Sequence, residues 1–311
     1  MNRSLLLACA FMILASCTGE NAGKRILPDV PDGAEAVSLH GEPLFAPVPP
    51  AAYRERFAGA KSDWEANPGN PELLIWYGRW AAYCGEYREA IRIFSDGAEA
   101  FPEDARMYRH RGHRYITIRE LDRAVADFDK AARLTAGKPD EVEPDGMPNP
   151  LNIPVSTLQS NIYYHLGLAR YLQGDLEGAL EAWDRDQALA VNDDMLVATM
   201  HWIYMTLREL GLEQQAAERL EAISGDMHVI ENDAYYQLCL FYKGRLDLET
   251  LTGEWGSGSS TMNDAMLFGL GNWFLYNGDR ETAMEFFSRI FDGGAWASFG
   301  YLAAESKMAK P

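Results

Sequence analysis

The sequence predicts an all-α protein, an α-solenoid of about six stacked helical hairpins with a capping helix at each end. The 311-residue chain is longer than one ordinary hydrophobic core supports, so internal repeats are expected. Identical residues also recur 34 positions apart, at Gly78 and Gly112, Ala90 and Ala124, and Phe94 and Phe128. A generic antiparallel helix bundle would explain the helices but not this repeated spacing.

The composition is that of a folded, acidic protein. Hydrophobic residues make up 47% of the chain and aromatic residues 12%, which is too apolar for intrinsic disorder. The formal net charge is −18, with a sequence pI near 4.7. Such a chain repels a phosphate backbone, so we expect no nucleic-acid partner.

The first residues have the pattern of an export signal. Arg3 provides a positive start, and residues 5–14 form an apolar run that is shorter than the roughly twenty residues needed to span a bilayer. Residues 14–17 resemble the lipobox of bacterial lipoproteins. This resemblance implies removal of residues 1–16 as a signal peptide and lipidation of Cys17, which would anchor the chain in a membrane. The alternatives are an ordinary secretory signal that is cleaved after Ser16 without lipid, and a buried apolar helix.

Two segments lie between the signal and the repeats. Residues 17–50 are rich in Pro, Gly, Asp and Glu without a sustained period, which predicts a lipidated flexible tether. Residues 51–70 are predicted to form an N-terminal capping helix that ends near residue 66. Four apolar residues fall on one face of this helix: Tyr53, Phe57, Ala60 and Trp64.

The repeats divide into two blocks. Residues 71–136 hold units one and two, residues 159–292 hold units three to six, and residues 293–311 are predicted to form a C-terminal capping helix. Units four and five are degenerate. Tyr204 stands at the small-residue position of unit four, and Glu249 stands at the alanine position of unit five.

Units one, two, three and six each combine small residues with one large aromatic residue. The glycines are expected where the two helices of a hairpin approach most closely, and the aromatic residue is expected to fill the gap to the next unit. This pattern resembles the tetratricopeptide repeat (TPR) family, which implies a concave groove that binds proteins or extended peptides. The glycines in question are Gly78, Gly112, Gly167 and Gly271, and the aromatic residues are Phe94, Phe128, Trp183 and Phe287.

An insertion of residues 137–158 interrupts the array between units two and three. It begins with an acidic run over residues 140–145 and continues with a segment in which prolines exclude a helix. A loop of this length inside a compact array is either ordered against the body and functional, or a mobile charged surface loop.

No catalytic motif occurs in the sequence, so we predict a protein that is not an enzyme, with no cofactor, no catalytic residue and no metal site. His110 and His113 lie three residues apart on a helix, but the arginines around them disfavour a cation. Cys84 and Cys239 lie in distant units and are expected to be buried apolar residues rather than a disulfide.

The first helix of unit two is unusually basic for so acidic a chain. By the TPR resemblance, groove-lining positions fall on six residues that are candidates for binding a peptide with an acidic side chain or a free C-terminus. They are Arg79, Tyr83, Arg109, His113, Tyr164 and Leu168. The competing interpretation is that the insertion neutralises the cluster internally, through Asp140, Glu141, Glu143 and Asp145.

The lipobox and the repeats together give a plan similar to that of NlpI-type envelope lipoproteins, with residues 240–246 and the last repeat helix as the local points of likeness. The resemblance implies a homodimer that acts as an adaptor at the outer membrane, facing the periplasm. We therefore predict a scaffold that binds proteins or peptides in the bacterial cell envelope. The alternatives are an accessory subunit of an outer-membrane assembly or uptake complex and, in third place, an enzyme with a site on the concave face.

Overall fold

The computed structural model describes residues 27–253 and 260–309. Within them, the regular structure is helical apart from one short antiparallel strand pair, β1 (Ala36–Val37) and β2 (Pro43–Leu44). The predicted signal peptide, Cys17 and the first part of the predicted tether lie outside the described residues. No helix in the described ranges is long and apolar enough to cross a bilayer.

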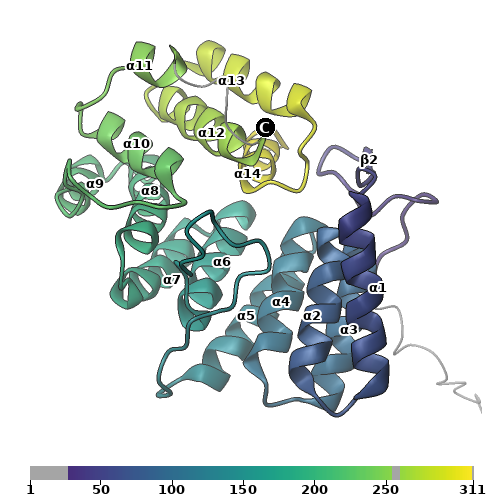
Figure 1. The fold of residues 1–311 in the computed structure, drawn as a ribbon. Helices are drawn as coiled ribbons and strands as arrows, with labels where there is room; N and C mark the ends of the chain where they lie inside the picture. Colours follow the sequence, from purple (N-terminus) through teal and green to yellow (C-terminus); the bar gives the residue numbers. More distant parts are fainter. Residues whose placement is uncertain (1–26, 254–259, 310–311) are drawn as a thin grey trace, which may run out of the picture.

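Helix α1 (Ala51–Ala66) precedes six successive pairs of helices in the described part of the chain (Figure 1). The first three pairs are α2 (Pro71–Tyr83) with α3 (Tyr87–Ala100), α4 (Ala105–Thr117) with α5 (Leu121–Thr135), and α6 (Leu158–Gln173) with α7 (Leu176–Leu189). The last three pairs are α8 (Asp193–Glu209) with α9 (Glu213–Leu220), α10 (Asp233–Tyr242) with α11 (Leu248–Gly253), and α12 (Ser260–Tyr276) with α13 (Arg280–Gly293). The predicted all-α solenoid of six TPR-type hairpins is confirmed. The two degenerate units are those with the short second helices α9 and α11.

The hairpins turn through a residue with positive φ. Five of the six turns use glycine, as at Gly85 and Gly174, because glycine has no Cβ to clash in this conformation. The turn between α4 and α5 instead uses Arg119, with φ of 67°. A side chain in this region costs roughly 1 kcal/mol or more, so the surrounding structure must offset the cost.

The repeat residues pack as the spacing predicts. A Cβ atom built on Gly78 would lie 2.5 Å from Cζ of Phe94, and one on Gly112 would lie 3.0 Å from Cζ of Phe128, so only glycine allows this approach. Phe94 also stacks on His110 of the next unit, with ring centroids 5.3 Å apart. Each aromatic ring therefore joins its own hairpin to the following one.

The segment before α1 differs from the predicted tether in its described part. Ala36 is only 1% exposed, the backbone N–H of Arg88 donates to Glu35 Oε2 over 2.8 Å, and Trp296 Nε1 donates to the carbonyl oxygen of Phe45 over 2.7 Å. The tether prediction is thus wrong for residues 34–46. Small apolar residues between prolines are enough to bury this segment against the body.

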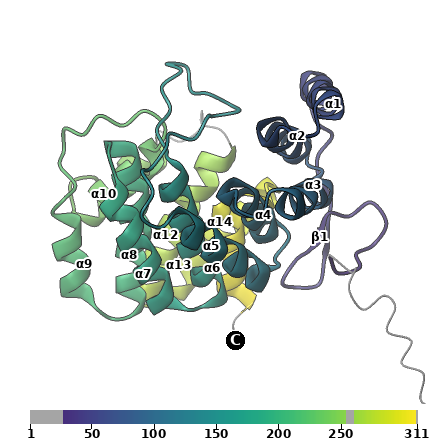
Figure 2. The ribbon, with the colours of Figure 1, turned by 90° about the horizontal axis from the view of Figure 1, so that it is seen from below.

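The C-terminal helix α14 (Phe299–Ala309) closes the array. This helix also reaches the N-terminal half of the chain, where its Glu305 accepts from Leu39 N over 3.0 Å and from Arg119 Nε over 2.9 Å. Glu305 is 1% exposed, so this is a buried ion pair that holds the Arg119 turn. Figures 1 and 2 show α12–α14 returning toward α4 and α6, with the N-terminal strands beside them.

Candidate functional site

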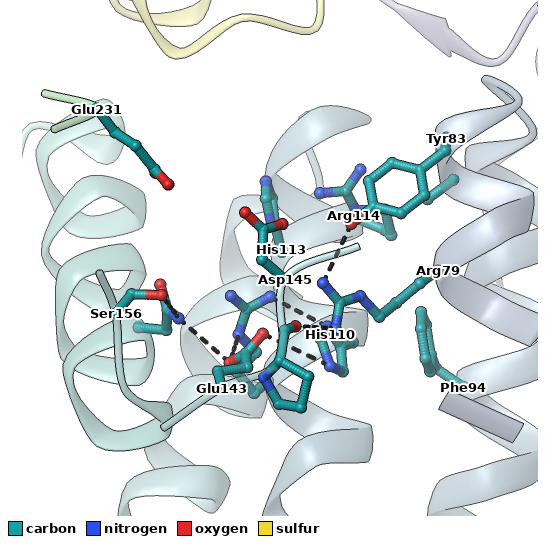
Figure 3. Close-up of a pocket in the computed structure, with 14 residues that line it drawn as sticks. Arg79, Tyr83, Phe94, His110, His113, Arg114, Glu143, Asp145, Ser156 and Glu231 are labelled. Carbon is teal, nitrogen blue, oxygen red and sulfur yellow. Dashed lines mark hydrogen bonds and ion pairs between the residues drawn. The ribbon is translucent and has the colours of Figure 1, made fainter. Parts of the chain in front are cut away.

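A polar cavity of about 250 Å³ lies on the concave side, between α2, α4, α6 and the insertion (Figure 3). We call it the basic cavity, because three arginines line it: Arg79, Arg109 and Arg114. Other polar residues in its wall are Tyr83, His110, His113, Glu143, Asp145, Ser156, Asn161 and Glu231. Four of the six predicted groove residues, Arg79, Tyr83, Arg109 and His113, therefore lie together in one cavity.

The insertion is ordered across the mouth of this cavity. Its two ends are joined by a bridge between Val142 and Thr157. Arg79 donates from Nη1 to the carbonyl oxygen of Pro144 over 2.6 Å, and the Asn149 amide donates to Glu231 Oε1 over 2.5 Å. The structure thus places the insertion against the repeats, in contact with α2 and with the α9–α10 connection.

One acidic residue of the insertion neutralises one arginine of the cluster. Nε of Arg109 lies 3.0 Å from Oε2 of Glu143, and both side chains are over 90% buried. The N–H is not aligned with that oxygen, so the contact is an ion pair without a well-formed hydrogen bond. The amide of Asn161 donates to the same oxygen over 3.2 Å.

The remaining predicted neutralisation by the insertion does not occur in the described residues. Asp140 caps the start of α6, accepting from Thr157 Oγ1 over 2.6 Å, and neither Glu141 nor Asp145 forms an ion pair there with an arginine. Three other arginines of α4 and the turn after it pair with acids outside the insertion. These pairs are Arg106 with Asp104 and Glu72, Arg111 with Asp127, and Arg119 with Glu305.

Arg114 is different, because its guanidinium forms neither an ion pair nor a hydrogen bond within residues 27–253 and 260–309. Its Cζ lies 5.6 Å from the centroid of the Tyr87 ring. Burial, together with the positive charges of Arg109 and Arg79, lowers the pKa of Arg114 to about 10. Burial thus disfavours the charged form of Arg114, and an anion beside it would stabilise that form. The cavity therefore offers a ligand a cation that has no acidic partner among the described residues.

The histidines of the cavity are neutral. Burial lowers the pKa of His110 and His113 well below the usual range, and the surrounding arginines add to the effect. His110 stacks on Phe94, and His113 contacts the ring of His165 with centroids 4.5 Å apart. These rings act as aromatic walls. In the described residues, no group of three His, Cys, Asp or Glu side chains could hold a metal ion.

The last two predicted groove residues lie elsewhere. Tyr164 lines an adjoining cavity, where Trp202 Nε1 donates to its hydroxyl over 2.8 Å. Leu168 is fully buried in the core, so it offers no surface to a ligand. This TPR position, which we expected to face the groove, belongs to the main hydrophobic core here, and α14 packs against the same helix α6.

Several polar groups that line the basic cavity were not among the predicted site residues, including Arg114, Asn161 and Glu231. Arg114 belongs to the basic cluster, but it does not occupy a usual groove position. Asn161 lies at the start of α6. Glu231 comes from the α9–α10 connection, which is held by Asp194 through backbone N–H groups, including that of Glu231 over 2.7 Å. No repeat position could have identified Glu231, because it lies between helices of degenerate units.

No family model matches the sequence, and a search of curated proteins also finds no match. Solved structures do resemble it in architecture. YrrB, described as a TPR protein with an unusual peptide-binding site, is 18% identical with a TM-score of 0.42 and matches 75% of this chain and 91% of its own. MamA is also 18% identical, with a TM-score of 0.43 over 62% of this chain and 90% of its own.

The Cut9–Hcn1 hetero-tetramer of APC/C gives a TM-score of 0.49 at 14% identity, over 83% of this chain and 46% of the matched chain. All three scores lie below 0.5 and all three identities below 25%. The function proposed for this chain therefore rests on its own site.

Proposed function

We propose that this protein is a lipid-anchored scaffold of the bacterial cell envelope that binds a peptide or protein partner through an acidic group in the basic cavity. The observation that carries the proposal is Arg114, a guanidinium without an acidic partner in the described residues, beside Arg79 and Arg109 in a cavity of about 250 Å³. Guanidinium groups bind carboxylates through paired, charge-assisted hydrogen bonds.

The insertion supports a peptide as the ligand. It crosses the cavity as an extended chain, and Arg79 binds a backbone carbonyl of Pro144 while Arg109 binds the carboxylate of Glu143. The cavity thus already recognises both the backbone and an acidic side chain of a polypeptide. A partner would add its own carboxylate at Arg114.

The binding test uses synthetic octapeptides. One pool carries Asp or Glu at two adjacent positions within otherwise random sequence, and a matched pool carries Asn or Gln there. The wild-type protein should retain the acidic pool, and Arg114→Gln should reduce retention at least tenfold, since a hydrogen bond to a charged group contributes about 1.5–3 kcal/mol. Equal retention of both pools, or an unchanged Arg114→Gln variant, would contradict the proposal.

Arg123→Gln is the matched control for this test. Arg123 is 40% exposed on the side chain, pairs with Glu120 and does not line the basic cavity. The substitution removes the same charge at another place on the same hairpin, so peptide retention should equal that of the wild type.

The anchor is proposed from the sequence, where residues 14–17 resemble a lipobox. Growth of an expressing bacterium with radioactive palmitate should label the full chain, and Cys17→Ala should remove the label and release the protein from the membrane fraction. Unlabelled wild-type protein in the soluble fraction would refute the anchor while leaving the peptide site untouched.

A further inference from the structure

A second cavity of about 270 Å³ adjoins the basic cavity. The two share Ser156, Asn161 and Glu231 in their walls. We call the second one the acidic cavity. Two carboxylates line it, those of Asp186 and Glu231, and no lysine or arginine does so among the described residues.

Asp186 is a buried carboxylate without a cation. It is 1% exposed and accepts from Ser160 Oγ over 2.6 Å and from Thr199 Oγ1 over 2.5 Å, so three helices meet at it. No basic side chain within residues 27–253 and 260–309 forms an ion pair with it. Burial raises the pKa of Asp186 to about 7, and no positive charge among the described residues opposes this shift.

The other walls suit an organic cation. Tyr164, Tyr235 and Phe299 place aromatic rings around the cavity, and such rings attract an ammonium group at short range. His165 also lines it, and burial keeps the pKa of His165 well below its usual range, so this ring adds no positive charge.

The rim of the cavity is fixed. Asp194 is 1% exposed and accepts from the backbone N–H groups of Ile230, Glu231 and Asn232 over 2.8, 2.7 and 2.8 Å. This clamp holds the backbone at Glu231, and the Asn149 amide donates to the Glu231 carboxylate at the junction of the two cavities. A ligand that entered would therefore meet preorganised groups.

We propose that the two cavities form one site for a short peptide with a free amino terminus, whose ammonium group lies against Asp186 and whose carboxylate lies against Arg114. The inference rests on the proposed function for its carboxylate end and adds a second end of opposite charge. One wall of the joined cleft supplies a guanidinium without an anionic partner and the other a carboxylate without a cationic partner among the described residues, so a zwitterion offers a partner to both at once. Together the cavities reach the size range of small-ligand sites, about 300–1,000 Å³.

The test uses oligoalanine peptides of three, four and five residues, each in a free form, an N-acetylated form and a C-amidated form. Isothermal titration calorimetry first compares the binding of these peptides to the wild-type protein. We expect at least one length of the free peptide to bind, and we expect acetylation to weaken its binding tenfold or more. In Asp186→Asn, the free and acetylated peptides should bind with affinities within twofold of each other.

The two ends of the ligand can fail separately. Equal binding of free and acetylated peptides to the wild type, or an acetylation effect that persists in Asp186→Asn, overturns this inference. If amidation weakens binding to the wild type but not to Arg114→Gln, the result supports the placement of the peptide carboxylate at Arg114 and says nothing of the ammonium end. An acetylation effect without an amidation effect supports the ammonium end and contradicts the proposed function. No binding of any free peptide overturns the shared site.

Discussion

Substitution of Asp186 by asparagine should remove a large pH dependence of stability. The folded pKa of Asp186 is about 7, whereas the carboxyl of an unfolded chain titrates near 3.8. The folded state therefore holds the proton more tightly than the unfolded state. The contribution of this group to the free energy of unfolding is fully present below pH 4 and is lost as the pH rises through 7.

The magnitude follows from the shift. At about 1.4 kcal/mol for each pH unit, a difference of about three units corresponds to roughly 4 kcal/mol. The asparagine side chain in the variant cannot titrate, and its amide still offers an oxygen to one hydroxyl and an N–H group to the other, so the links to Ser160 and Thr199 remain. Asp186→Asn should thus gain up to about 4 kcal/mol relative to the wild type between pH 4 and pH 8.

Urea unfolding followed by tryptophan fluorescence at several pH values measures this difference, and the other titrating groups cancel in the comparison. Asp184→Asn is the control, because Asp184 lies on the same helix with a side chain that is 52% exposed. Its difference from the wild type should stay within about 0.5 kcal/mol at every pH. Parallel stability curves for Asp186→Asn and the wild type would refute the account of Asp186 as an uncompensated buried carboxylate.

Two further predictions concern the fold. Gly78→Ala should lower the free energy of unfolding in urea by about 1–3 kcal/mol, because its Cβ would lie 2.5 Å from the buried Phe94 ring. Gly59→Ala is the control: its Cβ would meet nothing within 4 Å, so this substitution should be neutral or stabilising. Equal effects of the two substitutions would contradict the close approach of Gly78 to Phe94. Arg119→Gly should remove the strain of the positive φ but leave the Glu305 carboxylate buried without its cation. Thermal unfolding should therefore show a net loss of stability of about 2–4 kcal/mol. A net gain of stability would mean that the ion pair does not hold α14.

The repeat spacing allows the hairpins to be predicted because each one depends on residues that are close in sequence. Gly78 and Phe94 lie within one unit, and Gly112 and Phe128 repeat the same contact 34 residues later. The packing of the C-terminal helix α14 against α4 could not be predicted in this way. It depends on Phe299, whose ring centroid lies 5.3 Å from that of His113, and such distant pairs leave no periodic signal.

The basic cavity was partly predictable for the same reason. The repeat positions of Arg79 and Arg109 placed both residues in the groove. Arg114 matters because no acidic residue in the described part of the chain lies close enough to pair with it, and the sequence does not show which residues surround it. Asp186 was missed although its sequence position carries a signal. It follows Trp183 by three residues on α7, which places a charged residue on the buried stripe of the helix.

The most direct test of the peptide-binding site is a crystal structure of the protein with the best-retained acidic octapeptide. The account predicts a ligand carboxylate within about 3 Å of the Arg114 guanidinium, inside the basic cavity and beneath the insertion. A peptide bound elsewhere, for example along the outer surface of α3 and α5 with Arg114 still without a partner, would contradict it.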